Sequence, residues 1–264
     1  MKKLGFIGVG NMGGALLRGC AKKIPGDEIV IADAAAEKTS QFREEYGCEV
    51  LTAAGAAAEA EYLFIGVKPQ MAAELFDGIR EALAGREVPP VLVTMMAGRT
   101  MAQVRELAGL NCPIIRIMPN VAAAVGEAMI LCDSRDVSDG QLAEFADFMS
   151  GCGKLDFLPE KLIDAGASVS GCGPAYVCLF VEALADGAVK CGVPRKKALD
   201  YAVQTLLGTA KLLGETGKHP GVVKDEVTSP GGTTIEGVEA LEENGFRYAV
   251  MQAVVRSFEK NRKL

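Results

Sequence analysis

The chain has a single histidine, His219, no tryptophan, and no two cysteines in a C-x-x-C spacing. One imidazole cannot build a histidine metal cluster, so metal-assisted chemistry is not expected. The eight cysteines have neither zinc-site nor disulfide spacing, and their mostly apolar surroundings are typical of small buried side chains. They are Cys20, Cys48, Cys112, Cys132, Cys152, Cys172, Cys178 and Cys191.

An excess of basic charge is also missing. The net charge of -6 gives no footprint for nucleic acid. We find no apolar run approaching the roughly 18 residues that span a bilayer. Lys2 and Lys3 precede the apolar segment Leu4–Val9, which is too short for a signal peptide. We therefore expect a soluble, cytoplasmic protein that binds neither membrane nor nucleic acid.

The 264 residues, 49% of them hydrophobic, can bury one large core or two smaller ones. Strand-like and helix-like segments alternate along the first half, which predicts an α/β fold with a parallel sheet and helices on both faces. The expected strands there are Leu4–Val9, Glu28–Ala32, Tyr62–Val67, Val91–Met95 and Ile114–Met118. The expected helices are Asn11–Lys22, Ala35–Tyr46, Gln70–Ala84 and Thr100–Leu107. Ligands of such sheets bind at the carboxyl ends of the strands.

The first strand ends in the dinucleotide-binding pattern G-x-G-x-x-G, formed by Gly8, Gly10 and Gly13. Gly8 allows the tight turn, Gly10 lets the backbone approach a pyrophosphate, and Gly13 lets the helix pack close to the strand. The amides of Asn11 and Met12 begin the following helix and face the phosphates. A plain glycine turn is the alternative, and the position between strand and helix favours the cofactor.

Asp33 ends the second strand, 20 positions after Gly13. An acid there bonds the ribose 2′-OH of NAD and repels the 2′-phosphate of NADP. An ordinary turn aspartate is the alternative. Lys38 is close enough in sequence to hold a phosphate, so the sequence leans to NAD(H) and leaves NADP(H) open.

Two later strand ends complete the predicted cofactor site. Val67, Lys68 and Pro69 close the third strand, and Pro69 suits the first turn of a helix. Lys68 either faces the cofactor or is a solvated surface lysine. Ala97 and Gly98 end another strand with small side chains, which either admit the nicotinamide or mark a simple turn.

The predicted secondary structure changes near Pro159 from alternating strands and helices to helices. Glu127–Cys132 and Lys154–Leu158 are the last expected strands, and the chain from Lys161 onward is almost entirely helical. We predict a dinucleotide-binding domain over 1–160 and a helical dimerisation and substrate domain over 161–264. The run Ala175–Val189 is apolar nearly all round and needs cover on every side, which predicts a homodimer or higher homo-oligomer.

A second glycine cluster opens a helix near the C-terminus. Gly231 and Gly232 precede Thr233 and Thr234, so several amides and two hydroxyls point at one spot. That arrangement suits a carboxylate. A helix cap with a flexible approach is the alternative.

The segment Ser229-Pro230-Gly231-Gly232-Thr233-Thr234, followed by Gly237, Val238 and Leu241, resembles the signature of pyrroline-5-carboxylate reductases. Three further stretches occur in that family's order, so the likeness covers essentially the whole chain. They are Val67-Lys68-Pro69, Arg116-Ile117-Met118-Pro119-Asn120 and Ser170-Gly171-Cys172-Gly173-Pro174-Ala175-Tyr176.

The family reduces the cyclic imine pyrroline-5-carboxylate to L-proline with NAD(P)H, the last step of proline biosynthesis, on a Rossmann domain joined to a helical dimerisation domain. The resemblance implies that Thr234 is catalytic, bonding the ring nitrogen to position it or to relay a proton through water. It implies that backbone amides of Gly231, Gly232 and Thr233 hold the substrate carboxylate. Ser229 and Asn120 are the other implied substrate-binding residues.

Four positions depart from the family pattern. Val121 and Ala122 replace its Thr-Pro, Cys172 replaces a serine, and Asp33 differs from the many members that use NADPH. Related cyclic imino acids therefore stay open as substrates, as does the choice of cofactor.

Two other classes of protein are alternatives to a reductase of this family. A β-hydroxyacid dehydrogenase would carry a catalytic lysine and an asparagine where this chain has Val177 and Phe180. A regulatory protein that senses NAD(P) without turnover would not need the Ser229–Thr234 cluster.

Overall fold

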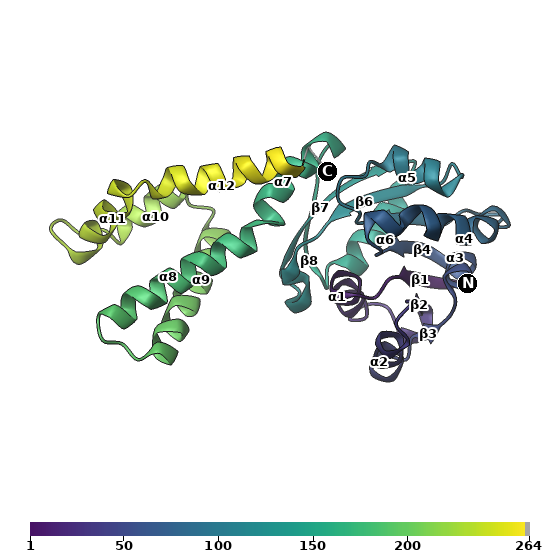
Figure 1. Cartoon of the computed structure of the whole chain (residues 1–264), viewed down its shortest axis with the longest axis horizontal. Coiled ribbons are helices and arrows are strands. Elements are labelled where there is room, and N and C mark those ends of the chain that lie inside the picture. Colours follow the sequence, from purple (N-terminus) through teal and green to yellow (C-terminus); the bar gives the residue numbers. More distant parts are fainter. Residues whose placement is uncertain (262–264) are drawn as a thin grey trace. The chain divides into compact units, whose positions relative to one another are not determined.

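The computed structural model describes residues 1–261, which divide into two compact units. The first, here the sheet unit, holds residues 1–172 together with 258–261, and the second, here the helical unit, holds Gly173–Ser257. Both are drawn in Figure 1.

The sheet unit is built on eight strands within the described residues. They are β1 (Lys2–Ile7), β2 (Ile29–Ala32), β3 (Glu49–Val50), β4 (Ala60–Ile65), β5 (Val91–Thr94), β6 (Ile114–Met118), β7 (Ala128–Arg135) and β8 (Gly153–Phe157). Its helices are α1 (Asn11–Cys20), α2 (Ala36–Tyr46), α3 (Ala53–Glu59), α4 (Ala72–Ala84), α5 (Met101–Ala108), α6 (Asp139–Met149) and α7 (Glu160–Ser170).

The strands lie in the order β3-β2-β1-β4-β5-β6-β7-β8. All neighbours are parallel except β6 and β7, which pair antiparallel. The order reverses direction between β1 and β4, so the carboxyl ends of these two strands open a crevice where such sheets bind ligands.

Alternate residues of the central strands enter two different cores. Phe6 and Phe64 join a core with α1 and α6, and their rings stack with centroids 4.4 Å apart. Ile7 and Ile65 face the opposite way into a core with α3, α4 and α5. A sheet buried on both faces explains why these strands are nearly continuous apolar runs. The predicted α/β fold class, with its helical second part, is confirmed.

A buried ion cluster attaches α7 to the sheet. Arg116 on β6 is 2% exposed, and its guanidinium lies 2.7 Å from the Asp164 carboxylate and 3.5 Å from Glu160. Glu160 also accepts a hydrogen bond from the Met101 amide. Such a charge is stable in the interior only when it is paired, so α7 is tied to the sheet unit rather than to the helices after it.

The helical unit has very little core of its own. Its helices are α8 (Gly173–Lys190), α9 (Arg195–Thr216), α10 (Pro220–Glu226), α11 (Thr233–Glu243) and most of α12 (Phe246–Asn261). Within its described residues the buried apolar side chains are small apart from Val223, and Ala185, Ala198 and Ala202 form its core cluster. Tyr176 donates a hydrogen bond to the Ala253 carbonyl and so links α8 to α12.

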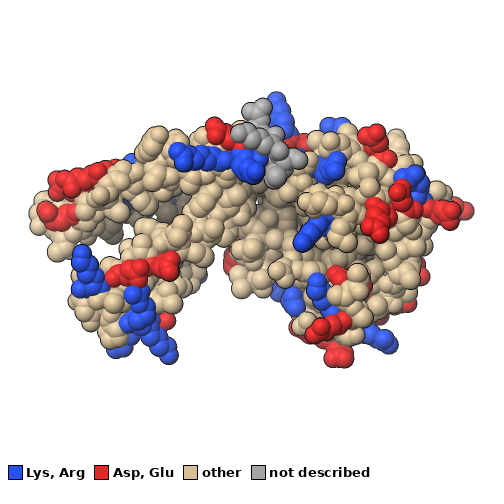
Figure 2. All heavy atoms as spheres, in the orientation of Figure 1, with Lys and Arg blue, Asp and Glu red and all other residues tan. Residues whose placement is uncertain are grey.

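Large apolar side chains cover the outside of this unit. Leu179, Leu207 and Tyr248 are between 58% and 65% exposed. In the face drawn in Figure 2, broad uncharged stretches of the helical unit lie between its charged side chains. Exposed apolar area of this extent marks a surface that another molecule covers.

The expectation that no apolar run reaches membrane length is wrong. The helical stretch Glu160–Lys190 contains a window long and apolar enough to cross a bilayer, and only 6% of that window is buried. It is the one stretch of this kind within the described residues. Length and composition are the same for a membrane span and for a helix covered by a second chain, so they do not separate the two.

The cysteine expectation is correct for five residues and wrong for three. Cys20, Cys48, Cys112, Cys132 and Cys152 are buried, whereas Cys172, Cys178 and Cys191 are exposed free thiols. Burial raises the pKa of Cys132 to about 12, so this thiol is un-ionised at neutral pH and chemically inert.

Candidate functional site

The turn after β1 is a contact between backbones. Gly8 has φ +95°, and a Cβ on it would lie 2.8 Å from the Gly66 carbonyl at the end of β4. A Cβ on Gly13 would lie 2.1 Å from the Gly8 carbonyl oxygen. The amide of Gly8 donates to Ala32 O at the end of β2, and that of Gly66 donates to Ile7 O. Glycine is required at all three positions because no side chain fits between these backbones.

Gly10 is different, because the protein leaves open space beside it. A Cβ there would meet only Lys38 Nζ, at 3.9 Å, and the φ of -67° suits any residue. Gly10 caps α1 without a side-chain hydrogen bond, so the first amides of that helix, beginning with Asn11 and Met12, are free to bind an anion. The space and the free donors fit the pyrophosphate of a dinucleotide.

Asp33 is fixed by two backbone amides. Its Oδ2 accepts from the Val9 amide at 2.9 Å, and its Oδ1 accepts from the Ala35 amide at 2.9 Å. The carboxylate thus joins the glycine turn to the end of β2. It remains half-buried and lines the cavity described next.

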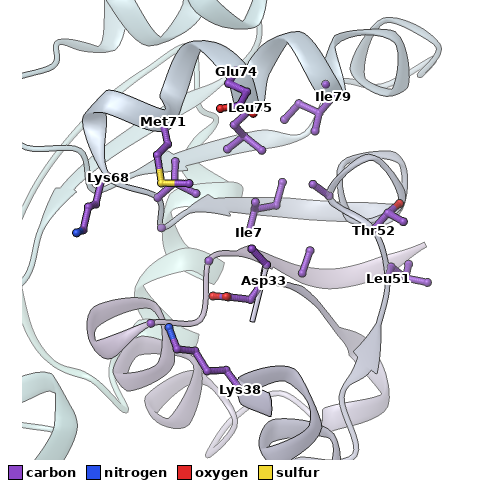
Figure 3. Close-up of a pocket in the computed structure, with 18 residues that line it drawn as sticks. Ile7, Asp33, Lys38, Leu51, Thr52, Lys68, Met71, Glu74, Leu75 and Ile79 are labelled. Atoms are coloured by element: carbon purple, nitrogen blue, oxygen red, sulfur yellow. The ribbon is translucent and has the colours of Figure 1, made fainter. Parts of the chain in front are cut away.

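A cavity of about 670 Å³ opens at the crevice between β1 and β4 (Figure 3). Gly8, Gly10, Asp33, Val67 and Lys68 line it, so the structure brings these five predicted cofactor residues to one site. A cavity of this size accommodates a nucleotide-sized ligand. In Figure 3 Asp33 and Lys38 lie on one side of it, and Met71, Glu74 and Leu75 on the other.

One wall of the cavity was missed in the sequence. Met71, Leu75 and Ile79 line it from the start of α4, at a spacing of four residues. Their exposure falls along the helix from an exposed Met71 through a half-buried Leu75 to a buried Ile79. A helical stripe of this kind is indistinguishable from core packing in the sequence.

Leu51 and Thr52 also line the cavity, and the sequence did not predict them. These two residues follow β3, a strand of two exposed residues that has no apolar pattern to reveal it. Thr52 then caps α3 by accepting a hydrogen bond from the Gly55 amide.

The other predicted cofactor residues lie outside the cavity lining. Pro69 begins a short 3₁₀ turn, Pro69–Met71, as expected for proline in a first turn. Asn11, Met12 and Gly13 form the first turn of α1. Ala97 and Gly98 lie in an exposed turn after β5, where Gly98 has φ +70°.

Asn120 uses both ends of its amide to hold the backbone. Its Oδ1 accepts from the Ala122 amide at 3.1 Å, and its Nδ2 donates to Ser170 O at 2.8 Å. It therefore connects the segment after β6 with the last residue of α7. A substrate contact for Asn120 stays a prediction.

The second glycine cluster lies in the helical unit and presents free donors. Gly231 has φ +66°, and the amide of Gly232 donates to Ser229 O at 3.0 Å. Gly232 caps α11 without a side-chain hydrogen bond, so the first amides of this helix have no side-chain partner. Thr233 and Thr234 are exposed beside them.

Two family models match the chain. Residues 160–264 match the pyrroline-5-carboxylate reductase dimerisation model, and residues 3–98 match the model of the coenzyme F420-dependent NADP oxidoreductases. Pyrroline-5-carboxylate reductase of Escherichia coli is 38% identical over 268 residues, which cover 100% of this chain and 98% of the relative. The enzyme of Glycine max is 40% identical over 267 residues, covering 99% and 95%.

The chain belongs to the pyrroline-5-carboxylate reductase family.

Solved structures of reductases in this family have the same fold. The enzyme of Coxiella burnetii superposes with a TM-score of 0.91 at 25% identity, covering 99% of this chain and 98% of that one. The Plasmodium falciparum pyrroline carboxylate reductase with NADP bound superposes with a TM-score of 0.86 at 29% identity, covering 99% and 97%. A nicotinamide dinucleotide is thus present in one such structure.

Two residues argue against the alternative of a β-hydroxyacid dehydrogenase. Such an enzyme needs a proton donor at the position of Val177, and a valine side chain cannot donate a proton. Phe180, at the other position, packs against Phe246 with ring centroids 5.9 Å apart and so joins α8 to α12.

The different surroundings of Gly10 and Gly13 predict different consequences of adding one methyl group. Gly13→Ala forces a Cβ against the Gly8 carbonyl and should lower the free energy of unfolding by about 1–3 kcal/mol. Gly10→Ala fills only the open space and should change stability by less than about 1 kcal/mol while weakening NADH binding at least about tenfold. Urea unfolding and calorimetric titration with NADH measure the two effects. A Gly10→Ala protein that binds NADH normally would contradict the assignment.

Proposed function

We propose that this chain reduces 1-pyrroline-5-carboxylate to L-proline with NAD(P)H. The observation that carries the proposal is full-length membership of a family whose curated relatives bear this name, in a chain that has both the dinucleotide cavity and the Ser229–Thr234 cluster. Related cyclic imino acids are the alternative substrates.

The helix start at Gly232 supplies the anchor for the substrate. Amides of Gly231 and Thr233 bind the carboxylate, helped by the positive end of the α11 dipole and by the Ser229 hydroxyl, while the Gly232 amide donates to Ser229 O and so shapes the turn around them. Asn120 donates one Nδ2 hydrogen to Ser170 O, and in this proposal it binds the substrate with the other.

Reduction of the C=N bond requires a hydride at carbon and a proton at nitrogen. The reduced nicotinamide, when bound, supplies the hydride. The exposed Thr234 hydroxyl bonds the ring nitrogen, orients it, and passes it a proton from water, because a threonine hydroxyl is too weak an acid to supply the proton itself. Most of the acceleration then comes from holding the two reactants in contact.

Residues 1–160 form the dinucleotide-binding domain and 161–264 the dimerisation and substrate domain in this proposal. The protein is a cytoplasmic homodimer or a higher homo-oligomer. The exposed apolar face of α8, α9 and α12 supports this assembly, since a second copy of the chain covers it without a membrane.

Removal of the Thr234 hydroxyl tests the catalytic assignment. Thr234→Ala should lower kcat about 100-fold and leave the Kd for NADH unchanged, because the group acts on the ring nitrogen only. Thr234→Ser should recover most of the activity. Thr209→Ala is the matched control, since its hydroxyl is bonded within α9 to Thr205 O. Steady-state rates with pyrroline-5-carboxylate measure this, and full activity of Thr234→Ala would refute it.

Asp33 is proposed to make the protein prefer NADH. A 2′-phosphate at this carboxylate meets a repulsion of about 1–4 kcal/mol. Asp33→Asn removes the charge and keeps one acceptor for the backbone, so the kcat/KM ratio of NADPH to NADH should rise about tenfold or more. Glu37→Gln, an acid four residues on and outside the cavity lining, should leave the ratio unchanged. Preference for NADPH in the unaltered protein would contradict the proposal.

The homodimer is tested by its mass in solution. Light scattering at micromolar concentration without detergent should give about 55 kDa, twice the 27.7 kDa of one chain, or a multiple of it. Leu207→Glu puts a charge on the exposed apolar face and should shift the mass toward one chain, whereas Gln204→Glu on the same helix is the charge control. A protein that stays monomeric, or that needs detergent to remain in solution, would refute the dimer.

A further inference from the structure

Lys38 has a position that the fold does not explain. It lies in the first turn of α2, and its side chain extends toward the glycine turn (Figure 3). Its ammonium is 3.9 Å from the place of a Cβ on Gly10, which puts it at the open space before α1. Among the described residues we find no hydrogen-bond or ion-pair partner for this ammonium. A cation held at an open, donor-lined space is placed for an anion.

Lys38 could bind either of two phosphate-containing parts of a dinucleotide. One is the pyrophosphate, which the amides of α1 receive, and the other is the 2′-phosphate of NADP(H), which lies at the ribose. Asp33 marks the ribose end, and both of its carboxylate oxygens are held there by the amides of Val9 and Ala35. A 2′-phosphate next to this fixed negative charge is repelled, so the ribose end does not favour a ligand phosphate that Lys38 could bind.

The cavity beyond Asp33 supports the same choice. Leu51 and Thr52 also line it, and in Figure 3 they lie on the opposite side of Asp33 from the Lys38 ammonium, which lies beside the glycine turn. The ammonium therefore faces the pyrophosphate end of the site.

We propose that Lys38 binds the cofactor pyrophosphate and so adds a charged contact that serves NADH and NADPH equally. This rests on the proposed function only in taking a nicotinamide dinucleotide as the ligand. Lys38 then supplies affinity, and Asp33 alone supplies the preference between the two cofactors.

The test is direct binding of NADH and NADPH by calorimetry in the absence of substrate. Lys38→Gln keeps a polar side chain, one atom shorter, without the charge. It should raise the Kd for both cofactors by the same factor, about tenfold, because one charge-assisted contact is lost in each complex. Arg43→Gln is the matched control: it removes the same charge from the same helix at a residue outside the cavity lining, and should change either Kd less than about twofold.

A second background separates the two phosphates. In Asp33→Asn, where NADPH is no longer repelled, Lys38→Gln should still weaken NADH and NADPH equally. A loss confined to NADPH would assign Lys38 to the 2′-phosphate and overturn the proposal. No loss for either cofactor, or an equal loss in Arg43→Gln, would also overturn it. Binding that behaves as expected in a protein without pyrroline-5-carboxylate turnover would refute the proposed function and leave the Lys38 contact in place.

Discussion

The contact of bare backbones at Gly8, Gly13 and Gly66 is the constraint on which the site depends. It brings the ends of β1 and β4 and the start of α1 closer together than any side chain permits. That approach creates the crevice at the reversal of strand order, and Gly10, the N-cap of α1, lines it. The glycines therefore have two separate tasks: three of them allow the contact, and Gly10 leaves room for the ligand beside it.

The two units are stabilised in different ways. The sheet unit buries large side chains on both faces of its strands, and each such side chain contributes about 1.5–3 kcal/mol. The helical unit buries mostly alanines and leaves most of its leucines and tyrosines exposed, so it lacks most of this contribution within one chain. A second copy of the chain would supply it. In the proposed dimer, folding of the helical unit and assembly are one process, and the order of the Ser229–Thr234 cluster depends on it.

Residues lining the cavity could be predicted from the sequence when their residue type has few structural uses at that position. They could not be predicted when the same residue type has several uses. Gly8, Gly10 and Asp33 were predicted to lie at one site, and they line one cavity, because a tight turn, an open backbone approach and an acid at the end of the second strand leave few other residues possible. Met71 and Leu75 were missed because an apolar stripe on a helix has the same pattern whether it covers a core or a cavity. The residue pattern becomes helical near Pro159, just before α7. Arg116 nevertheless binds Asp164 of α7, and that helix belongs to the sheet unit. Long-range pairing of this kind has no signal in a single sequence.

The proposed role of Asp33 in cofactor preference would link that preference to the architecture of the turn. A surface acid whose only task was to repel a phosphate could be replaced freely, but this carboxylate also accepts the amides of Val9 and Ala35. Replacement by a small residue would leave both donors without a partner, at about 1–3 kcal/mol for each one that water does not reach. Asparagine satisfies only one of them. If Asp33 sets the cofactor preference as proposed, that preference is part of the same hydrogen-bonded structure that shapes the glycine turn, and changing it without loss of order requires a residue that also replaces those two acceptors.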